Sequence, residues 1–148
     1  MEELQQKLRI IRITSVDETV IPQINSLLDE GTTWDLKQGK KFLKNQDNVL
    51  FLAFWEEKVA GFLTGHRLQR FDKRKAEVLL YEVGVRENFR KRGIGKTLIG
   101  ELNNWAKEAG ADEVWVLTNR SNTAAVALYQ SAGGVTESQD ELMYTFKI

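Results

Sequence analysis

The residues with the clearest chemical potential form the run from Tyr81 to Lys96, in which two glycines one residue apart follow a group of cations. A predicted strand precedes the run and a predicted helix follows it. Unpaired amides at a helix N-terminus, the positive end of the helix dipole and nearby cations all favour a phosphate or pyrophosphate. Glycine lets the backbone approach such an anion closely. The sequence therefore predicts that a phosphate-bearing cofactor is bound by Arg90, Lys91, Arg92, Gly93, Ile94, Gly95 and Lys96.

Three kinds of phosphate loop compete for this run. A P-loop would require glycine where the chain has Arg90, and a dinucleotide fingerprint would require a third glycine where it has Leu98. The pattern that fits is Arg-x-x-Gly-x-Gly, read at Arg90, Gly93 and Gly95. Taken alone, these six residues are equally compatible with a basic, solvated turn before an ordinary helix.

The elements on either side of the loop are well marked. Residues 77–83 are apolar and rich in β-formers, as in a buried strand. After the loop, apolar residues recur at helical spacing and Gly110 supplies a stop signal. The predicted buried positions of this helix are Ile94, Leu98, Ile99, Leu102, Trp105, Ala106 and Ala109.

The remaining chain predicts short strands and helices without a linker or repeat. Ser15 and Glu18 suggest a capping box for a first helix that has Pro22 in its first turn, and Asp35 suggests the cap of a second. Ser121 or Asn122 caps a last helix. Strands are expected at 8–14, 49–55, 59–68, 76–85 and 112–118, with a closing hairpin at 135–137 and 142–146. The class is therefore α+β with a mixed sheet.

The loop and a second motif together resemble the GCN5-related N-acetyltransferase (GNAT) superfamily. The second motif is Asn122-x-x-Ala125-x-x-Leu128-Tyr129-x-x-x-Gly133. The resemblance implies a single domain over 1–148 with a mixed, mostly antiparallel sheet of six to seven strands, four flanking helices and a splay at the cofactor site. It also implies acetyl-CoA as cosubstrate. One departure is Gly134, where the family usually has a bulky apolar residue; this predicts a looser packing contact after the helix.

Within the superfamily, the chain is most similar to the type I aminoglycoside 3-N-acetyltransferases. The similarity rests on Val59-Ala60-Gly61, on Leu68-x-x-Phe71, on the strand ending at Val85 and on the Ala-Val-Ala-Leu-Tyr run that ends at Tyr129. It implies acetyl transfer from acetyl-CoA to a primary amine of an aminoglycoside, by direct attack in a ternary complex, and thus antibiotic resistance. The alternatives are a GNAT that acetylates a protein N-terminus, a lysine, a polyamine or another small amine, and a non-catalytic CoA-binding module.

The resemblance also suggests roles in the chemistry. An alkyl ammonium titrates near pH ~10, so a base or a desolvating pocket must help to remove its proton. Glu82 is the leading candidate, either as the base or as an anchor for a cationic substrate, although the aminoglycoside enzymes tend to have Asp there. Glu77 has the opposite pleat parity in a regular strand, so it is expected to face elsewhere. Tyr129 would protonate the CoA thiolate, or else be a core aromatic residue of its helix.

The backbone of the same strand is expected to hold the pantetheine arm. Val83 and Val85 would pair with it, and Gly84 between them would permit the bulge that splays the sheet. The Val83 N–H would polarise the thioester oxygen. Asn122 would bond the cofactor arm, cap its helix, or do both.

A polycationic acceptor would favour carboxylates around the open side of the cleft. The candidates lie in the early helical region, in the strand at Glu82 and in the final hairpin. For each carboxylate of the helical region and the hairpin, a place on a solvated charged face is the favoured interpretation. The predicted substrate-binding residues are Asp29, Glu30, Asp35, Glu82 and Asp140.

Composition argues against nucleic-acid-binding, membrane-spanning and metal-binding functions. The net charge is zero, and the cations of the loop have no accompanying aromatic stacking pattern, which disfavours nucleic acid. No apolar run approaches membrane-spanning length. The chain has no cysteine and a single histidine, His66, expected to point at solvent or a cleft, so no metal site is predicted. The absence of cysteine suits a cytoplasmic protein. Dimers are common among relatives, which suggests a homodimer by analogy.

Overall fold

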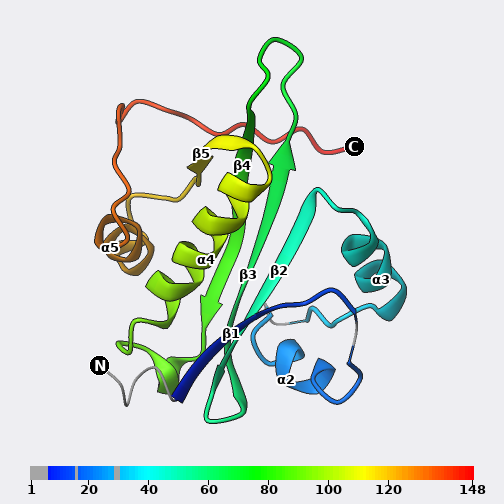
Figure 1. Ribbon diagram of the computed structural model, residues 1–148. Coiled ribbons are helices and arrows are strands. Elements are labelled where there is room, and N and C mark those ends of the chain that lie inside the picture. Colours follow the sequence, from blue (N-terminus) through cyan, green and yellow to red (C-terminus); the bar gives the residue numbers. More distant parts are fainter. Residues whose placement is uncertain (1–6, 16, 29–30) are drawn as a thin grey trace. The chain divides into compact units, whose positions relative to one another are not determined.

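The computed structural model describes residues 7–15, 17–28 and 31–148, and it separates into two compact units, Met1–Leu117 and Thr118–Ile148. In the first unit, five strands form one sheet in chain order (Figure 1): β1 (Leu8–Arg12), β2 (Asn48–Trp55), β3 (Lys58–Leu68), β4 (Ala76–Val85) and β5 (Ala111–Trp115). Its helices are α2 (Ile21–Asn25), α3 (Leu36–Lys44), a 3₁₀ turn (Glu87–Phe89) and α4 (Ile94–Glu108). The second unit contains α5 (Thr123–Ser131).

The sheet is mixed and mostly antiparallel, as predicted. β1 to β4 pair antiparallel, and β5 joins β4 in parallel. The four α-helices expected are present among the described residues, but the prediction of six to seven strands is wrong, because the described chain has five. The predicted closing hairpin at 135–146 has no regular structure. Its apolar residues are exposed, with Phe146 at 85%. Alternating apolar residues become a strand only where a partner strand supplies backbone hydrogen bonds.

The sheet is covered on both faces within the first unit. α4 packs on one face and α2 and α3 lie on the other (Figure 1), which explains why β2 is apolar at successive positions rather than alternately. On the α4 face, Leu98 and Leu102 are fully buried. On the opposite face, the core cluster is Ile24, Leu50, Leu52 and Phe62.

The two predicted helix starts in the N-terminal half have different outcomes. The capping box at Ser15 and Glu18 does not form, because α2 begins only at Ile21, with Val20 as its N-cap and Pro22 in its first turn. The predicted cap of α3 is confirmed: the side chain of Asp35 accepts a hydrogen bond from the Gln38 N–H at 2.8 Å.

Gly61 lies where β3 and β4 approach closely, and this gives a stability prediction. A Cβ at Gly61 would lie 2.8 Å from the Gly84 carbonyl oxygen, a backbone atom that cannot rotate away. We expect Gly61→Ala to lower the free energy of unfolding by about 1–3 kcal/mol in urea denaturation. Gly100→Ala is the matched control: it lies in α4 with nothing near its Cβ, and helix propensity predicts a gain of about 0.5–1 kcal/mol. Equal stability of the two variants would contradict the close approach.

Candidate active site

The predicted phosphate loop is built as a left-handed turn that leads into α4. β4 ends at Val85, and the Arg90 guanidinium Nε donates back to the Val85 carbonyl at 3.1 Å. Lys91 has φ 63° and Gly93 has φ 77°, so both lie in the region that glycine tolerates best. The Thr97 N–H bonds the Gly93 carbonyl at 3.0 Å. The amides of residues 94–96 therefore precede the hydrogen-bond ladder of the helix, as an anion site requires.

The predicted cations of the loop divide into two groups. Arg92 is held against the protein, because its guanidinium lies 4.7 Å from the Trp55 ring and 5.4 Å from the Phe89 ring. Arg90 is anchored to the end of β4 by its bond to the Val85 carbonyl. Lys91 and Lys96 are exposed on either side of the amides. All four side chains belong to the loop, but the two arginines also have structural roles.

Arg86, which follows the end of β4, makes contacts that the sequence did not predict. Its guanidinium donates to the Gln23 carbonyl at 2.8 Å and to the Ser26 hydroxyl, and its amide donates to the Ala60 carbonyl at 2.8 Å. The end of β4 is thereby tied to α2. No local motif indicates this contact, since the partners in α2 lie about 60 positions earlier in the chain.

The edge of β4 that pairs with β5 is open beyond the middle of the strand. In the described chain, the parallel register of β4 with β5 runs from Ala76–Ala111 to Leu79–Trp115 and stops there. Residues 80–85 pair only with β3 in that register. Their other edge therefore presents backbone groups that β5 does not take up, and alternate residues such as Val83 and Val85 direct these groups the same way. The pairing of β4 with β5 thus ends before Val83, where the sequence predicts the sheet to splay.

The bulge in β4 is not at Gly84. Gly84 pairs regularly with Phe62, and a Cβ there would lie 2.8 Å from the Phe62 ring. The register instead shifts at Tyr81, because Glu82 opposes Thr64 while Leu80 opposes Gly65. Gly84 is required for close packing, and the extra residue of the bulge is Tyr81.

The bulge also overturns the predicted separation of Glu77 from Glu82. Glu77 opposes Leu68 and Glu82 opposes Thr64, and those partners are four residues apart on β3, so both glutamates lie on one face of the sheet. This face of the sheet also carries the core cluster that packs against α2 and α3. Glu82 is exposed there. Glu77 is engaged elsewhere, because it accepts a hydrogen bond from Arg70 at 2.8 Å.

The acid and cofactor-arm candidates lie in the second unit. Asn122 is the N-cap of α5, and its side-chain oxygen accepts the Ala125 N–H at 3.1 Å. Tyr129 is half-buried, and this burial raises the pKa of its hydroxyl. The Gly134 N–H donates to the Tyr129 carbonyl at 2.9 Å. A Cβ at Gly134 would lie 2.9 Å from that oxygen, so glycine permits the close return of the chain at the end of α5.

The structure does not gather the carboxylates that were predicted to bind the acceptor into one described cluster. Asp29 and Glu30 lie outside the described residues. Asp35 uses one oxygen as the cap of α3. Asp140 lies in the irregular segment of the second unit, where its N–H donates to the Ser138 hydroxyl at 3.1 Å. Glu82 lies in the first unit, within the stretch of β4 that β5 does not pair.

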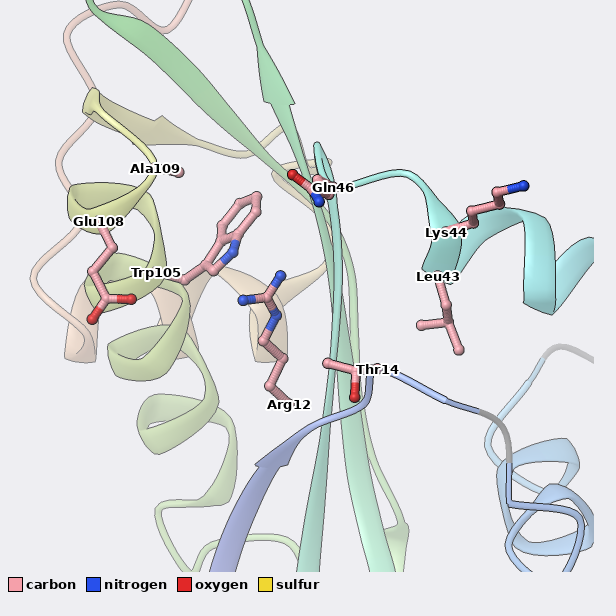
Figure 2. Close-up of a pocket in the computed structure, with 8 residues that line it drawn as sticks. All are labelled: Arg12, Thr14, Leu43, Lys44, Gln46, Trp105, Glu108 and Ala109. Carbon is pink, nitrogen blue, oxygen red and sulfur yellow. The ribbon is translucent and has the colours of Figure 1, made fainter.

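A separate hollow of about 540 Å³ lies away from this site. It is found at the C-terminal end of α4, where Trp105 lies beside Arg12 at 5.9 Å (Figure 2). The phosphate loop is at the opposite end of that 15-residue helix, roughly 20 Å away. The lining residues are Arg12, Thr14, Leu43, Lys44, Gln46, Trp105, Glu108 and Ala109.

Comparison with known proteins identifies the family. The model of the acetyltransferase (GNAT) family matches residues 17–134. The chain belongs to this family. The match includes both predicted motifs. In the described part of the chain, no helix could span a membrane and no cluster of side chains could hold a metal ion.

Curated GNAT relatives match over part of their length. The chain is 30% identical over 94 residues to N-acetyltransferase 8 of Homo sapiens, which covers 64% of this chain and 41% of that protein. It is 35% identical over 57 residues to the ribosomal protein bS18-alanine N-acetyltransferase of Salmonella typhimurium, covering 38% of each. The chain therefore spans about two fifths of the length of the curated relatives it matches.

Solved structures match over almost the whole chain. An aminoglycoside acetyltransferase from an uncultured soil metagenomic sample, solved in complex with sisomicin, superposes with a TM-score of 0.84 at 26% identity and covers 97% of this chain and 99% of that chain. The aminoglycoside N-acetyltransferase AAC(6')-Iy in complex with CoA gives 0.78 at 22% identity, with 95% and 94% covered. At that identity, the second match shows the fold.

Proposed function

We propose that this chain transfers the acetyl group of acetyl-CoA to a primary amine, and that the acceptor is an aminoglycoside. The observation that carries the proposal is the open edge of β4 over residues 80–85, which leads directly into the amide-rich loop at 93–96. An extended pantetheine could add to that edge as a strand would, with its diphosphate at the start of α4. The aminoglycoside acetyltransferases of the same fold, one with CoA bound, support this cofactor and acceptor.

Glu82 and the backbone of Val83 would then act at the thioester. Glu82 follows the bulge on the face opposite α4, within the open stretch of the strand. Its carboxylate attracts a cationic amine, and the Val83 N–H, in our proposal, bonds the thioester oxygen as negative charge develops on it. The exposed Lys91 and Lys96 balance the charge of the diphosphate.

A thiol-release assay with acetyl-CoA tests the proposal directly. The panel of acceptors is sisomicin, a polyamine, free amino acids and peptides with an N-terminal alanine. We expect the highest kcat/KM with the aminoglycoside. A folded protein without turnover on any acceptor would leave a non-catalytic CoA-binding module, which calorimetry with CoA would detect. The position of the acetylated amine, predicted from the sequence as 3-N, is read from the NMR spectrum of the product.

A peptide acceptor is the second candidate. It is favoured by the similarity to the bS18-alanine N-acetyltransferase, whose name states a protein N-terminus as its substrate. Preference for the alanine peptide over sisomicin would favour this alternative. A neutral acceptor that outcompetes every cationic amine would contradict the role proposed for Glu82.

Tyr129 is expected to act as the acid that protonates the departing thiolate. Because burial raises the pKa of its hydroxyl, Tyr129 keeps its proton at neutral pH. We expect Tyr129→Phe to lower kcat by about 10²-fold, within the range of general acid catalysis, with the Kd for CoA changed less than about threefold. Stopped assays and calorimetry measure the two quantities. A large loss of CoA affinity with unchanged kcat would refute the acid role.

A further inference from the structure

His66, the single histidine of the chain, lies on the same face of the sheet as Glu82. Glu82 opposes Thr64, and Thr64 and His66 are two residues apart on β3, so all three side chains lie on that face. Within the described structure, the Thr64 hydroxyl is buried without a hydrogen-bond partner. A polar group therefore lies between Glu82 and His66 on the face where the proposed acceptor would bind.

Hydrogen bonds define which nitrogen of His66 carries its proton. The Asn48 side-chain nitrogen donates to the Phe42 carbonyl at 3.1 Å, so the other atom of that amide, the oxygen, faces the ring. This Asn48 oxygen lies 2.8 Å from His66 Nδ1. Since an amide oxygen only accepts, Nδ1 must donate, and the neutral ring then has its lone pair on Nε2.

The surroundings keep the His66 ring neutral. Partial burial lowers the pKa of His66 from its ordinary value. The Phe42 ring lies 5.6 Å away on one side and the Tyr81 ring 5.5 Å away on the other. Phe42 of α3 and Asn48 of β2 do not titrate. The ionisable groups that β4 contributes to this face are Tyr81, Glu82 and Glu77, and Glu77 is ion-paired with Arg70. Nε2 is thus a basic nitrogen at neutral pH.

We propose that Nε2 of His66 accepts the proton of the acceptor ammonium while the carboxylate of Glu82 holds that ammonium in place. This inference rests on the proposed function. The sequence left open whether Glu82 is the base or the anchor of the substrate; here His66 is the base and Glu82 is the anchor. A carboxylate ordinarily titrates near ~4.3 and an imidazole near ~6.5, so an ordinary imidazole is the stronger base of the two. A base works best when its pKa lies near the operating pH.

The proton transfers of the reaction balance. The ammonium gives one proton to Nε2, and its freed lone pair attacks the thioester carbonyl carbon, which forms the C–N bond. The C–S bond then breaks, and the second N–H proton of the amine passes to the departing thiolate. The imidazolium releases its proton to water, so one amine, one acetyl group and one thiol are accounted for.

The single histidine makes the test direct. In ¹⁵N-detected imidazole NMR of the whole protein, we expect protonated Nδ1, unprotonated Nε2 and a pKa below the ordinary value. We expect His66→Asn, which keeps a donor toward Asn48 but lacks Nε2, to lower kcat/KM for sisomicin by about 10²-fold at neutral pH and to remove the acid limb of the pH profile. A protonated Nε2, or an unchanged profile in an active variant, would overturn the inference.

A second variant keeps the test independent of folding defects. Asn48→Asp places a carboxylate against Nδ1, which raises the pKa of His66 and should move the acid limb to higher pH. If the acid limb of the pH profile does not move in Asn48→Asp, the inference is overturned. If the wild-type protein turns over no amine of the panel, the proposed function and this inference fail together. If the wild type is active and both variants leave the limb unmoved, only the inference fails.

Discussion

Glu82→Gln is expected to raise the KM for a polycationic amine about 10- to 100-fold and to leave the Kd for CoA within about twofold. Hydrogen bonds to charged groups contribute about 1.5–3 kcal/mol, and the exposed position of Glu82 reduces this by solvent screening. Because every ~1.4 kcal/mol is tenfold in affinity, the change falls in that range. Initial rates against acceptor concentration, at saturating acetyl-CoA, measure it.

The chain provides a matched control for this prediction. Glu77 lies on the same strand and, because of the bulge, on the same face as Glu82, but it is ion-paired with Arg70 at 2.8 Å. Glu77→Gln should change the KM for the acceptor by less than about twofold. If KM for the acceptor rises equally in the two variants, the effect comes from the overall negative charge of this surface and not from a specific contact with Glu82. A fall in kcat with loss of the acid limb in Glu82→Gln would make Glu82 the base.

Gly93→Val is expected to weaken CoA binding by about 100-fold. Gly93 has φ 77°, a conformation that a β-branched residue rarely adopts. The loop must then rearrange, and the amides at the start of α4 lose their alignment. Loss of one or two hydrogen bonds to a charged diphosphate, at about 1.5–3 kcal/mol each, accounts for the size of the effect. Calorimetric titration with CoA measures it.

Gly110→Val separates backbone strain from ligand contact. Gly110 follows the other end of α4 with φ 78°, and a Cβ added to either glycine would have no other atom within 4 Å. Both variants should therefore lose similar amounts of unfolding free energy, on the order of 1–2 kcal/mol. Only Gly93→Val should lose CoA affinity. Comparable affinity losses in the two variants would show that the strain, and not the loop, is responsible.

Local patterns predicted the framework of the first unit well. The apolar positions of α4, from Ile94 to Ala106, are buried as their helical spacing requires. The left-handed Gly93 and the cap formed by Asp35 are also consequences of neighbouring residues. Such features depend on contacts only a few positions apart, which a sequence displays directly.

The missed features depend on distant partners. The bulge at Tyr81, which brings Glu77 to the face of Glu82, arises from the register between β3 and β4. Arg86 is tied to α2 across about 60 positions. The predicted C-terminal hairpin failed for the same kind of reason, because alternating residues from Leu142 onward do not specify a partner strand.

The sequence by itself determined the glycine turn before α4, the amphipathic pattern of that helix and the presence of a carboxylate in the strand before the turn, because side-chain periodicity and glycine placement are local properties. Only the tertiary structure decided where β4 parts from β5, which face Glu82 shares with His66, and which nitrogen of His66 is basic. The physical reason is that strand register and hydrogen-bond partners are set by the packing of segments far apart in the chain, and a shift of one residue reverses the face to which every later side chain points.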